Sequence, residues 1–361
     1  MRSPDARALT TRIAVVGASA AGLAAALAAA RAGARVTLYE SRAQVGVPAA
    51  PAIVGFDFLW PQELPRPRES VRRRLQGVRL RGASGRGPLV DAPLSLFDRA
   101  RLDAHLAAEA EKAGARIETG AAADAWERAE ADITIFADGA RSEASRFLRP
   151  TRDPESLAWG AVLELEARAD EERLLLTLGS HAPGGRSQLN PLGGGRWSHW
   201  TFFRGDPERA EATARRALAL DARLQGWKDV EARFVGVAPD PVYTLPRQLV
   251  GPRVMVAGGA AGQGGLEVGL ASGWMAGDVA ARGGDLREYE RRWKARYERG
   301  YRRLRRASDA LGRLTDAEIA RLMEAWDEVR LTPAAGPRTL LAHPRGALAL
   351  AHAAFLAQAR A

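Results

Sequence analysis

Apolar and small residues at the start of the chain are grouped as a strand, a glycine-rich turn, a helix and a second strand. Ile13 to Val16 is a fully apolar run of strand length, and Gly17 to Gly22 is a turn. The alanine-rich stretch from Leu23 to Arg31 predicts a helix that ends near Gly33, a residue type typical of helix C-termini. Arg35 to Glu40 follows as a strand, and this order predicts a βαβ unit with a parallel sheet.

The pattern beyond this unit predicts further elements of the same kind. Leu96 to Ala113 has amphipathic helical spacing and precedes two short strands, whereas residues 43–68 show little periodicity and are expected to form a loop near the substrate. Much later, Arg253 to Ala257 is typical of a parallel strand, and it leads through glycines into a helix from Gly264 to Ala281.

Between these parts, residues 156–245 alternate as antiparallel strands do, interrupted by one helix from Pro207 to Leu220. We therefore expect an α/β fold in which a Rossmann-like domain carries an inserted antiparallel β-sheet domain and a helical C-terminal extension. The expected boundaries are 10–155 with 246–284 for the first domain, 156–245 with a contribution from loop 43–90 for the second, and 285–361 for the extension.

The last 75 residues read as helical. Tyr289, Trp293, Tyr297 and Tyr301 recur every four residues along a basic helix, and this stripe is more typical of a core-facing surface than of a membrane or partner face. The apolar tail from residue 340 to 356 is interrupted by polar residues and is too broken to span a bilayer.

Composition removes several classes of site. The chain has no cysteine, which excludes disulfides and thiolate chemistry, and its five histidines show no metal-ligand spacing, so no metal site is expected. The net charge of +10 comes from arginines interleaved with acidic residues, and no nucleic-acid-binding module is present. This charge favours anionic cofactors, or a peripheral contact of the basic C-terminal helices with an anionic membrane.

The apolar stretch from Ile13 to Ala30 resembles a targeting or membrane segment. It is mostly alanine and glycine, which transfer weakly into lipid, and it fits a strand, turn and helix better. The expected location is therefore cytoplasmic, with peripheral membrane contact as the open alternative.

The first glycine turn carries the pattern of a dinucleotide-binding loop. Gly17 permits the tight turn, a small Ser19 lets the backbone approach a pyrophosphate, and Gly22 lets the helix pack on the strand. Glu40 stands 18 residues after Gly22, at the end of the second strand, where a carboxylate accepts ribose hydroxyls. A structural turn in a sheet that binds no nucleotide is the alternative, and the pattern alone does not separate NAD from FAD.

Three further segments resemble FAD-dependent oxidoreductases of the para-hydroxybenzoate hydroxylase type, and a fourth resembles the geranylgeranyl reductase branch of that group. They are "ADGARS" (Ala137 to Ser142), "DRARLD" (Asp98 to Asp103), "RVMVAGGAAGQGGLEVGLASG" (Arg253 to Gly273) and "LREYERRWKARYERGYRRL" (Leu286 to Leu304). Their order over roughly residues 10 to 310 is most similar to the geranylgeranyl reductase branch.

This resemblance implies that FAD lies extended between both glycine turns, with the helix after the second turn directed at the flavin pyrimidine. It also implies that Arg99 reaches the FAD backbone and that Asp138-Gly139 supports the pyrophosphate side. The residues expected to contact FAD are Gly17, Ser19, Ala21, Gly22, Glu40, Ser41, Arg42, Arg99, Asp138, Gly139, Gly258, Gly259, Ala260, Gly264 and Gly269.

The chain departs from that family at three places. The family's Gly-Asp pair is Gly258-Gly259 here, so a carboxylate that accepts a ribityl hydroxyl is missing. Pro51 stands where the reductases have a cysteine. Their aromatic Tyr-x-Trp-x-Phe-Pro segment corresponds to "RSQLNP", with Arg186, Gln188 and Asn190 in place of the three rings, which favours a more polar or anionic substrate.

The strand "RWSHWTFF" adds candidates for the substrate pocket. Trp197, His199, Thr201 and Phe203 share one face, and Ser198, Trp200 and Phe202 share the other. One face is expected to pack on the fold and one to overlie the flavin, so Trp197 and Trp200 are candidate pocket residues. His199 is a candidate proton donor, against the commoner structural role of a histidine on a strand.

These features predict an FAD-dependent oxidoreductase with a small-molecule substrate. NAD(P)H would reduce the flavin without a separate nicotinamide domain, and the flavin would pass hydride to an organic or isoprenoid-like double bond, or would react with oxygen and hydroxylate. The alternatives are an NAD-dependent dehydrogenase and a flavin-poor binding protein that keeps the fold. The first would be colourless when purified, and the second would gain no stability from added FAD.

Overall fold

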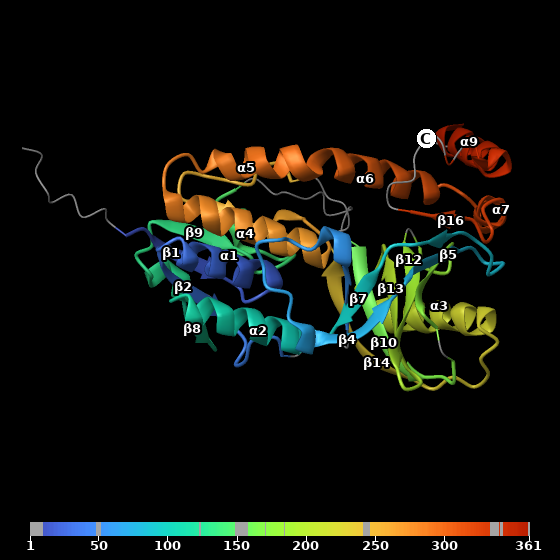
Figure 1. Ribbon diagram of the computed structural model, residues 1–361, viewed down its shortest axis with the longest axis horizontal. Coiled ribbons are helices and arrows are strands. Elements are labelled where there is room, and N and C mark those ends of the chain that lie inside the picture. The colour runs from blue at the N-terminus through green and yellow to red at the C-terminus, as the bar shows by residue number, and fades with distance from the viewer. Residues whose placement is uncertain are drawn as a thin grey trace, which may run out of the picture.

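The computed structural model describes residues 10–47, 52–122, 124–148, 158–169, 171–183, 185–240, 246–332, 339 and 342–359. Pro51 lies outside these ranges. The described residues form a parallel sheet with helices packed on it, a large mixed sheet beside it, and a layer of C-terminal helices along one side of both (Figure 1).

The first sheet has five strands in the order β15-β9-β1-β2-β8, and each neighbouring pair is parallel. Its members are β1 (Arg12–Val16), β2 (Arg35–Glu40), β8 (Arg116–Thr119), β9 (Ile133–Phe136) and β15 (Val254–Val256). Three helices pack with it: α1 (Ala20–Arg31), α2 (Arg99–Lys112) and α4 (Leu266–Arg282). The predicted βαβ unit and the late parallel strand are confirmed.

The second sheet has eight strands in the order β14-β10-β13-β12-β11-β5-β6-β16. They are β5 (Gly77–Arg81), β6 (Leu89–Val90), β10 (Ala158–Glu166), β11 (Arg173–Leu178), β12 (Arg186–Gly193), β13 (Arg196–Phe203), β14 (Ala232–Asp240) and β16 (Arg330–Leu331). Five of these strands lie within residues 156–245, and β10, β11 and β13 among them are the strands that the alternating pattern predicts there. The other three come from outside that segment.

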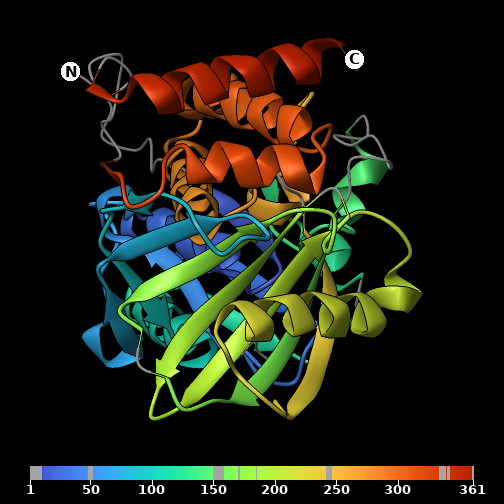
Figure 2. The same ribbon diagram turned by 90° about the vertical axis from the view of Figure 1, so that its right-hand side faces the viewer.

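One face of the eight-stranded sheet is covered by α3 (Ala210–Leu224), which crosses it in Figure 2. The helix begins and ends a few residues later than predicted, because Pro207–Arg209 forms a separate 3₁₀ turn. A three-stranded sheet, β3 (Ile53–Phe56), β7 (Leu94–Phe97) and β4 (Val71–Leu75), lies between the two larger sheets (Figure 1).

The C-terminal layer contains α5 (Arg287–Trp293), a π-helical turn at Lys294–Glu298, α6 (Arg299–Leu311), α7 (Asp316–Glu324) and α9 (Pro344–Ala359). Helices α5 and α6 run the length of the molecule, from the parallel sheet to the mixed sheet (Figure 1). Tyr289, Trp293 and Tyr301 are buried, as the aromatic stripe predicts, and Trp293 meets the Tyr301 ring edge-on.

None of the helices within the described ranges has the length and apolarity of a bilayer-spanning segment. In the same part of the chain, no three potential metal ligands gather into a site.

Candidate functional site

The carboxyl ends of the parallel strands meet along one edge of the five-stranded sheet. There β1 runs into Gly17, β2 ends at Glu40, β9 leads into Asp138 and β15 leads into Gly258. Ligands of such sheets bind outside this edge, because every strand presents a loop there and helix N-termini point toward it.

The turn after β1 is held tightly against the loop after β9. Gly17 has a φ of +95°, and a Cβ at that position would lie 2.8 Å from the Ala137 carbonyl oxygen. The Ser19 hydroxyl donates to the same carbonyl at 2.8 Å and accepts from the Gly22 N–H as the N-cap of α1. These contacts hold the start of α1 at this edge of the sheet, where a helix N-terminus favours an anion.

The second glycine turn lies directly against the first helix. A Cβ on Gly258 would come within 2.6 Å of the Ala21 Cβ, and a Cβ on Gly273 would lie 1.9 Å from the Ala21 carbonyl oxygen. Only glycine allows this approach of α4 to α1. The two bends, about 240 residues apart in the chain, thus converge on one edge of one sheet.

Glu40 is buried at the end of β2, with 3% of its surface exposed. Its carboxylate accepts hydrogen bonds from the Ala18 N–H at 2.8 Å and from the Arg42 N–H and Arg42 Nε at 2.9 Å. Burial favours the neutral acid, but these hydrogen bonds outweigh it and lower the pKa of Glu40 below its ordinary value. The group is therefore an anionic acceptor at neutral pH, with Arg42 folded over it.

Arg99 lies on α2 close to this group. Its Nε donates to both Asp103 carboxylate oxygens, at 2.9 and 2.8 Å. Burial raises the pKa of Asp103, although the positive charges of Arg99 and Arg42 oppose that rise. The first turns of α2 therefore lie close to Glu40 and Arg42.

The loop after β9 brings Asp138 and Gly139 to the edge. One Asp138 oxygen accepts from the Glu143 N–H at 2.8 Å, while the other is buried and has no partner among the described residues. Burial raises the pKa of this carboxyl. Gly259 packs on the same loop, because a Cβ at 259 would lie 3.2 Å from the Gly139 Cα.

Gly269, in the first turns of α4, is buried, yet a Cβ added to it would meet no heavy atom within 4 Å. The vacant space adjoins the second glycine turn, since the Gly258 Cβ position is 3.9 Å from the Gly269 Cα. Ala260 is buried beside it, and the Gly264 carbonyl accepts from the Tyr301 hydroxyl at 2.8 Å. The open space beside Gly269, the buried Asp138 oxygen without a partner among the described residues, and two helix N-termini at one edge fit an extended dinucleotide.

The candidate pocket residues of the eight-stranded sheet fall on two faces. Arg186, Gln188 and Asn190 of β12 pair in register with Phe202, Trp200 and Ser198 of β13, so these six share the face opposite α3. Gln188 Nε2 donates to Asn190 Oδ1 at 2.7 Å, and Asn190 Nδ2 donates to the Ser198 hydroxyl at 3.0 Å.

Trp197 and His199 lie on the other face, under α3. Trp197 belongs to the apolar core between α3 and the sheet, and its Nε1 donates to the Ala167 carbonyl at 3.2 Å. His199 is fully buried, and its Nε2 lies 2.9 Å from Asp221 Oδ2. Trp197 and His199 therefore lie on the opposite face of the sheet from Arg186, Gln188, Asn190 and Trp200. From that position neither side chain can contact a substrate bound on the other face.

Asp221, which the sequence did not single out, gathers the polar groups of that face. Its carboxylate accepts from Arg81, Thr177 and Ser187 at 2.7, 2.5 and 2.6 Å, besides His199. Burial opposes its ionisation, but the partners, His199 above all, lower the pKa of Asp221 far below its ordinary value. The cluster anchors α3 to four strands.

Glu267 is a second residue that the sequence did not single out. It lies in the first turn of α4, where its carboxylate accepts from the Phe56 N–H, and burial raises its pKa. The sequence shows an acidic residue within the small-residue segment "GGLEVG", and this was the only sign of a special role for Glu267. Its burial could not be predicted, because it depends on contact with β3, which is distant in the sequence.

Comparisons with known proteins agree with this geometry. Residues 15–54 match the NAD(P)-binding Rossmann-like domain family. Digeranylgeranylglycerophospholipid reductase 1 of Methanothermobacter thermautotrophicus is 28% identical to this chain, over 88% of the chain and 90% of the relative. The reductase of Methanocaldococcus jannaschii is 27% identical over 88% and 90%.

The chain is thus similar over most of its length to the digeranylgeranylglycerophospholipid reductases. The predicted resemblance to the geranylgeranyl reductase branch is confirmed, and with it the class of oxidoreductase. A geranylgeranyl bacteriochlorophyll reductase-like protein from Thermoplasma acidophilum shares the fold of this chain with a TM-score of 0.80, at 19% identity, over 96% of the chain and 100% of that protein.

The flavin-dependent monooxygenase PieE, solved with FAD and substrate, has a TM-score of 0.58 at 17% identity, over 96% of this chain and 72% of its own. At these identities both structures show that the fold is shared.

Proposed function

We propose that this oxidoreductase uses FAD, bound along the carboxyl edge of the five-stranded sheet, to reduce a carbon–carbon double bond of an isoprenoid-like substrate. The observation that carries the proposal is the contact between the two glycine turns, with Gly258 against Ala21. A single extended dinucleotide explains why two small-residue bends, remote in sequence, meet at one edge.

Each part of the edge has a role in this proposal. The N-terminus of α1 and the turn from Gly17 to Gly22 receive the pyrophosphate. Glu40 accepts the adenosine ribose hydroxyls, for which Arg42 must swing off the carboxylate. The cradle at Gly269 and the start of α4 hold the ribityl and flavin end, where the helix dipole stabilises negative charge. Bound FAD would supply hydride transfer from NAD(P)H to the substrate.

NAD(P)H is the proposed electron donor. The described residues form three sheets, and only the five-stranded sheet is wholly parallel. Within the described residues we therefore find one dinucleotide-binding sheet and no second sheet of that type for the nicotinamide. The nicotinamide would therefore bind transiently beside the flavin.

We also propose contact with an anionic membrane surface through α6. Arg302, Arg303 and Arg306 of this helix are exposed, and Leu304 among them has 47% of its surface exposed. A basic helix with apolar residues is typical of proteins that lie on a lipid surface.

The experiment is anaerobic reduction of the FAD-loaded protein. NADPH or NADH should bleach the flavin absorption, and adding vesicles that contain an unsaturated isoprenoid lipid should restore it while the lipid gains two hydrogens per double bond. Flavin that is never bound would favour a flavin-poor binding protein. Nicotinamide oxidation without any bound flavin would favour an NAD-dependent dehydrogenase.

A further inference from the structure

A cavity of about 460 Å³ lies between the open face of the eight-stranded sheet and the C-terminal helices, away from the five-stranded sheet. Its floor comes from β5, β11, β12 and β13, and its cover comes from α6 and α7. The volume is within the range of small-molecule sites. The cavity lies on the same sheet face as the proposed substrate pocket, so the inference below rests on the proposed function.

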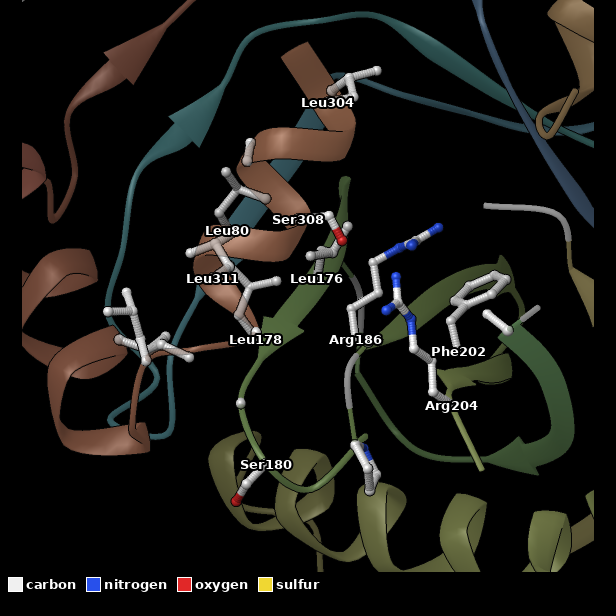
Figure 3. Close-up of a pocket in the computed structure, with 18 residues that line it drawn as sticks. Leu80, Leu176, Leu178, Ser180, Arg186, Phe202, Arg204, Leu304, Ser308 and Leu311 are labelled. Carbon is white, nitrogen blue, oxygen red and sulfur yellow. The ribbon is translucent and has the colours of Figure 1, made fainter. Parts of the chain in front are cut away.

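The walls of this cavity divide by chemistry. One side is formed by aliphatic side chains, among them Leu80, Leu176, Leu178 and Leu311. Figure 3 shows these leucines gathered on one side and the guanidinium groups of Arg186 and Arg204 on the other. Among the described residues that line the cavity, none is acidic. Its shape therefore suits an amphiphile with an apolar chain and an anionic head.

Arg186 is the uncompensated cation of the site. Its guanidinium lies over the Phe202 ring, 4.1 Å from the centroid, and within the described part of the chain it makes no ion pair. The charge of Arg186 reaches the buried carboxyl of Asp240: burial raises the pKa of Asp240, and Arg186 opposes that rise, but the two groups form no ion pair. A half-buried guanidinium without a partner favours binding of an anion.

Arg204 adds positive charge to the same end. One of its nitrogens lies 3.8 Å from Asp309, which also pairs with Arg305 at 3.4 Å. Two arginines thus share one carboxylate, and Figure 3 shows the Arg204 side chain pointing toward Arg186. The neighbouring polar residues do not compete for an anion, because Gln188, Asn190 and Ser198 are hydrogen-bonded to one another.

We infer that Arg186, assisted by Arg204, binds the phosphate head of an isoprenoid amphiphile whose chain lies along the leucine side of the cavity. Arg186 is then a specificity-determining residue, because it selects an anionic lipid over an uncharged isoprenoid of the same length. The resemblance places an aromatic ring of the reductase family at this position, so the contact through Arg186 is a feature of this chain.

The test is calorimetric titration of the full-length protein with farnesyl phosphate, farnesol and inorganic phosphate. Farnesyl phosphate should bind, and Arg186→Gln should weaken it at least about tenfold, with a smaller loss for Arg204→Gln. Arg186→Lys, which keeps the charge, should bind within about threefold of the wild type. Arg216→Gln, on the solvent side of α3, is the matched control and should change nothing.

Three outcomes would overturn the inference. Farnesol binding as tightly as farnesyl phosphate would exclude the anion clamp. Inorganic phosphate binding as tightly as farnesyl phosphate would exclude the apolar half of the site. Unchanged affinity in a folded Arg186→Gln protein would remove Arg186 from it. The flavin spectrum of the same samples keeps the two proposals apart, because loss of FAD binding with intact Arg186-dependent binding contradicts the proposed function alone.

Discussion

At residue 269, a buried glycine leaves open space beside the second glycine turn. Alanine is a better helix former than glycine by about 0.8–1.0 kcal/mol, and its methyl group would have no heavy atom of the described residues within 4 Å. The same methyl group would intrude into the space assigned to the ribityl chain.

We therefore predict that Gly269→Ala leaves the free energy of unfolding unchanged or raises it. FAD affinity should fall by about tenfold, because overpacking a filled site costs roughly 1–3 kcal/mol. Urea unfolding and flavin titration measure the two quantities separately. Gly300→Ala, whose added methyl group also meets nothing, is the control and should leave FAD affinity unchanged. Equal FAD affinity in the Gly269 and Gly300 variants would contradict the assignment of this cradle.

A second residue-scale prediction concerns Gly259, where the family has an aspartate. Gly259→Asp should tighten FAD by about ten- to a hundredfold, because a charged hydrogen bond contributes about 1.5–3 kcal/mol. The new Cβ lies 3.2 Å from Gly139, so the two loops must separate by a few tenths of an ångström. Gly259→Ala carries the same Cβ without the carboxylate. If both variants bind FAD alike, the predicted correspondence with the family is wrong.

The sequence placed His199 and Trp197 on one strand face without indicating which face the fold covers. Alternation separates two faces, but the partner that decides between them is Asp221 on α3, twenty-two residues further along. A carboxylate there offered no local signal, since a polar residue on a helix is ordinarily at the surface.

At the scale of elements, α3 is held to the mixed sheet by the Asp221 cluster. Arg81 on β5 is 1% exposed and pairs with Asp221 at 2.7 Å, so removing the carboxylate leaves a buried guanidinium charge without its counter-ion. Breaking a buried pair in this way costs about 3–5 kcal/mol.

Asp221→Asn should therefore lower the free energy of unfolding by about that amount at pH 7, measured with urea. Because the folded pKa of Asp221 is depressed, its contribution is fully present above the unfolded pKa of about 3.9 and decreases as pH falls below it. The difference between wild type and variant should thus shrink toward pH 3. Glu211→Gln, on the exposed side of α3, should stay within about 0.5 kcal/mol. A pH-independent difference would contradict the depressed pKa.

Local pattern predicted the elements of the parallel sheet well, because β1, α1 and β2 follow one another and carry clear periodicity. The mixed sheet was predicted only in part. Strands β6 and β16 contain two residues each, which is too short for any alternation to be seen. Their pairing, Arg330 with Leu89, joins segments about 240 residues apart and depends on the whole fold.

At the scale of the whole molecule, the C-terminal helices connect the two sheets. Tyr301 at the start of α6 donates to the Gly264 carbonyl near the second glycine turn, and Leu311 at the end of the same helix lines the cavity over the mixed sheet. The sequence predicted the convergence of the glycine turns through the order of its motifs. The cavity was not predicted, because α6 and the strands beneath it share no motif.

The central claim is that one dinucleotide spans both glycine turns, and a comparison of FAD with its two halves tests this most directly. Titrations of the full-length protein with FAD, ADP and FMN should give an FAD affinity at least about a hundredfold above that of either half, because the linked halves bind together. FAD binding no tighter than ADP would mean that only the first turn is used, and it would contradict the account.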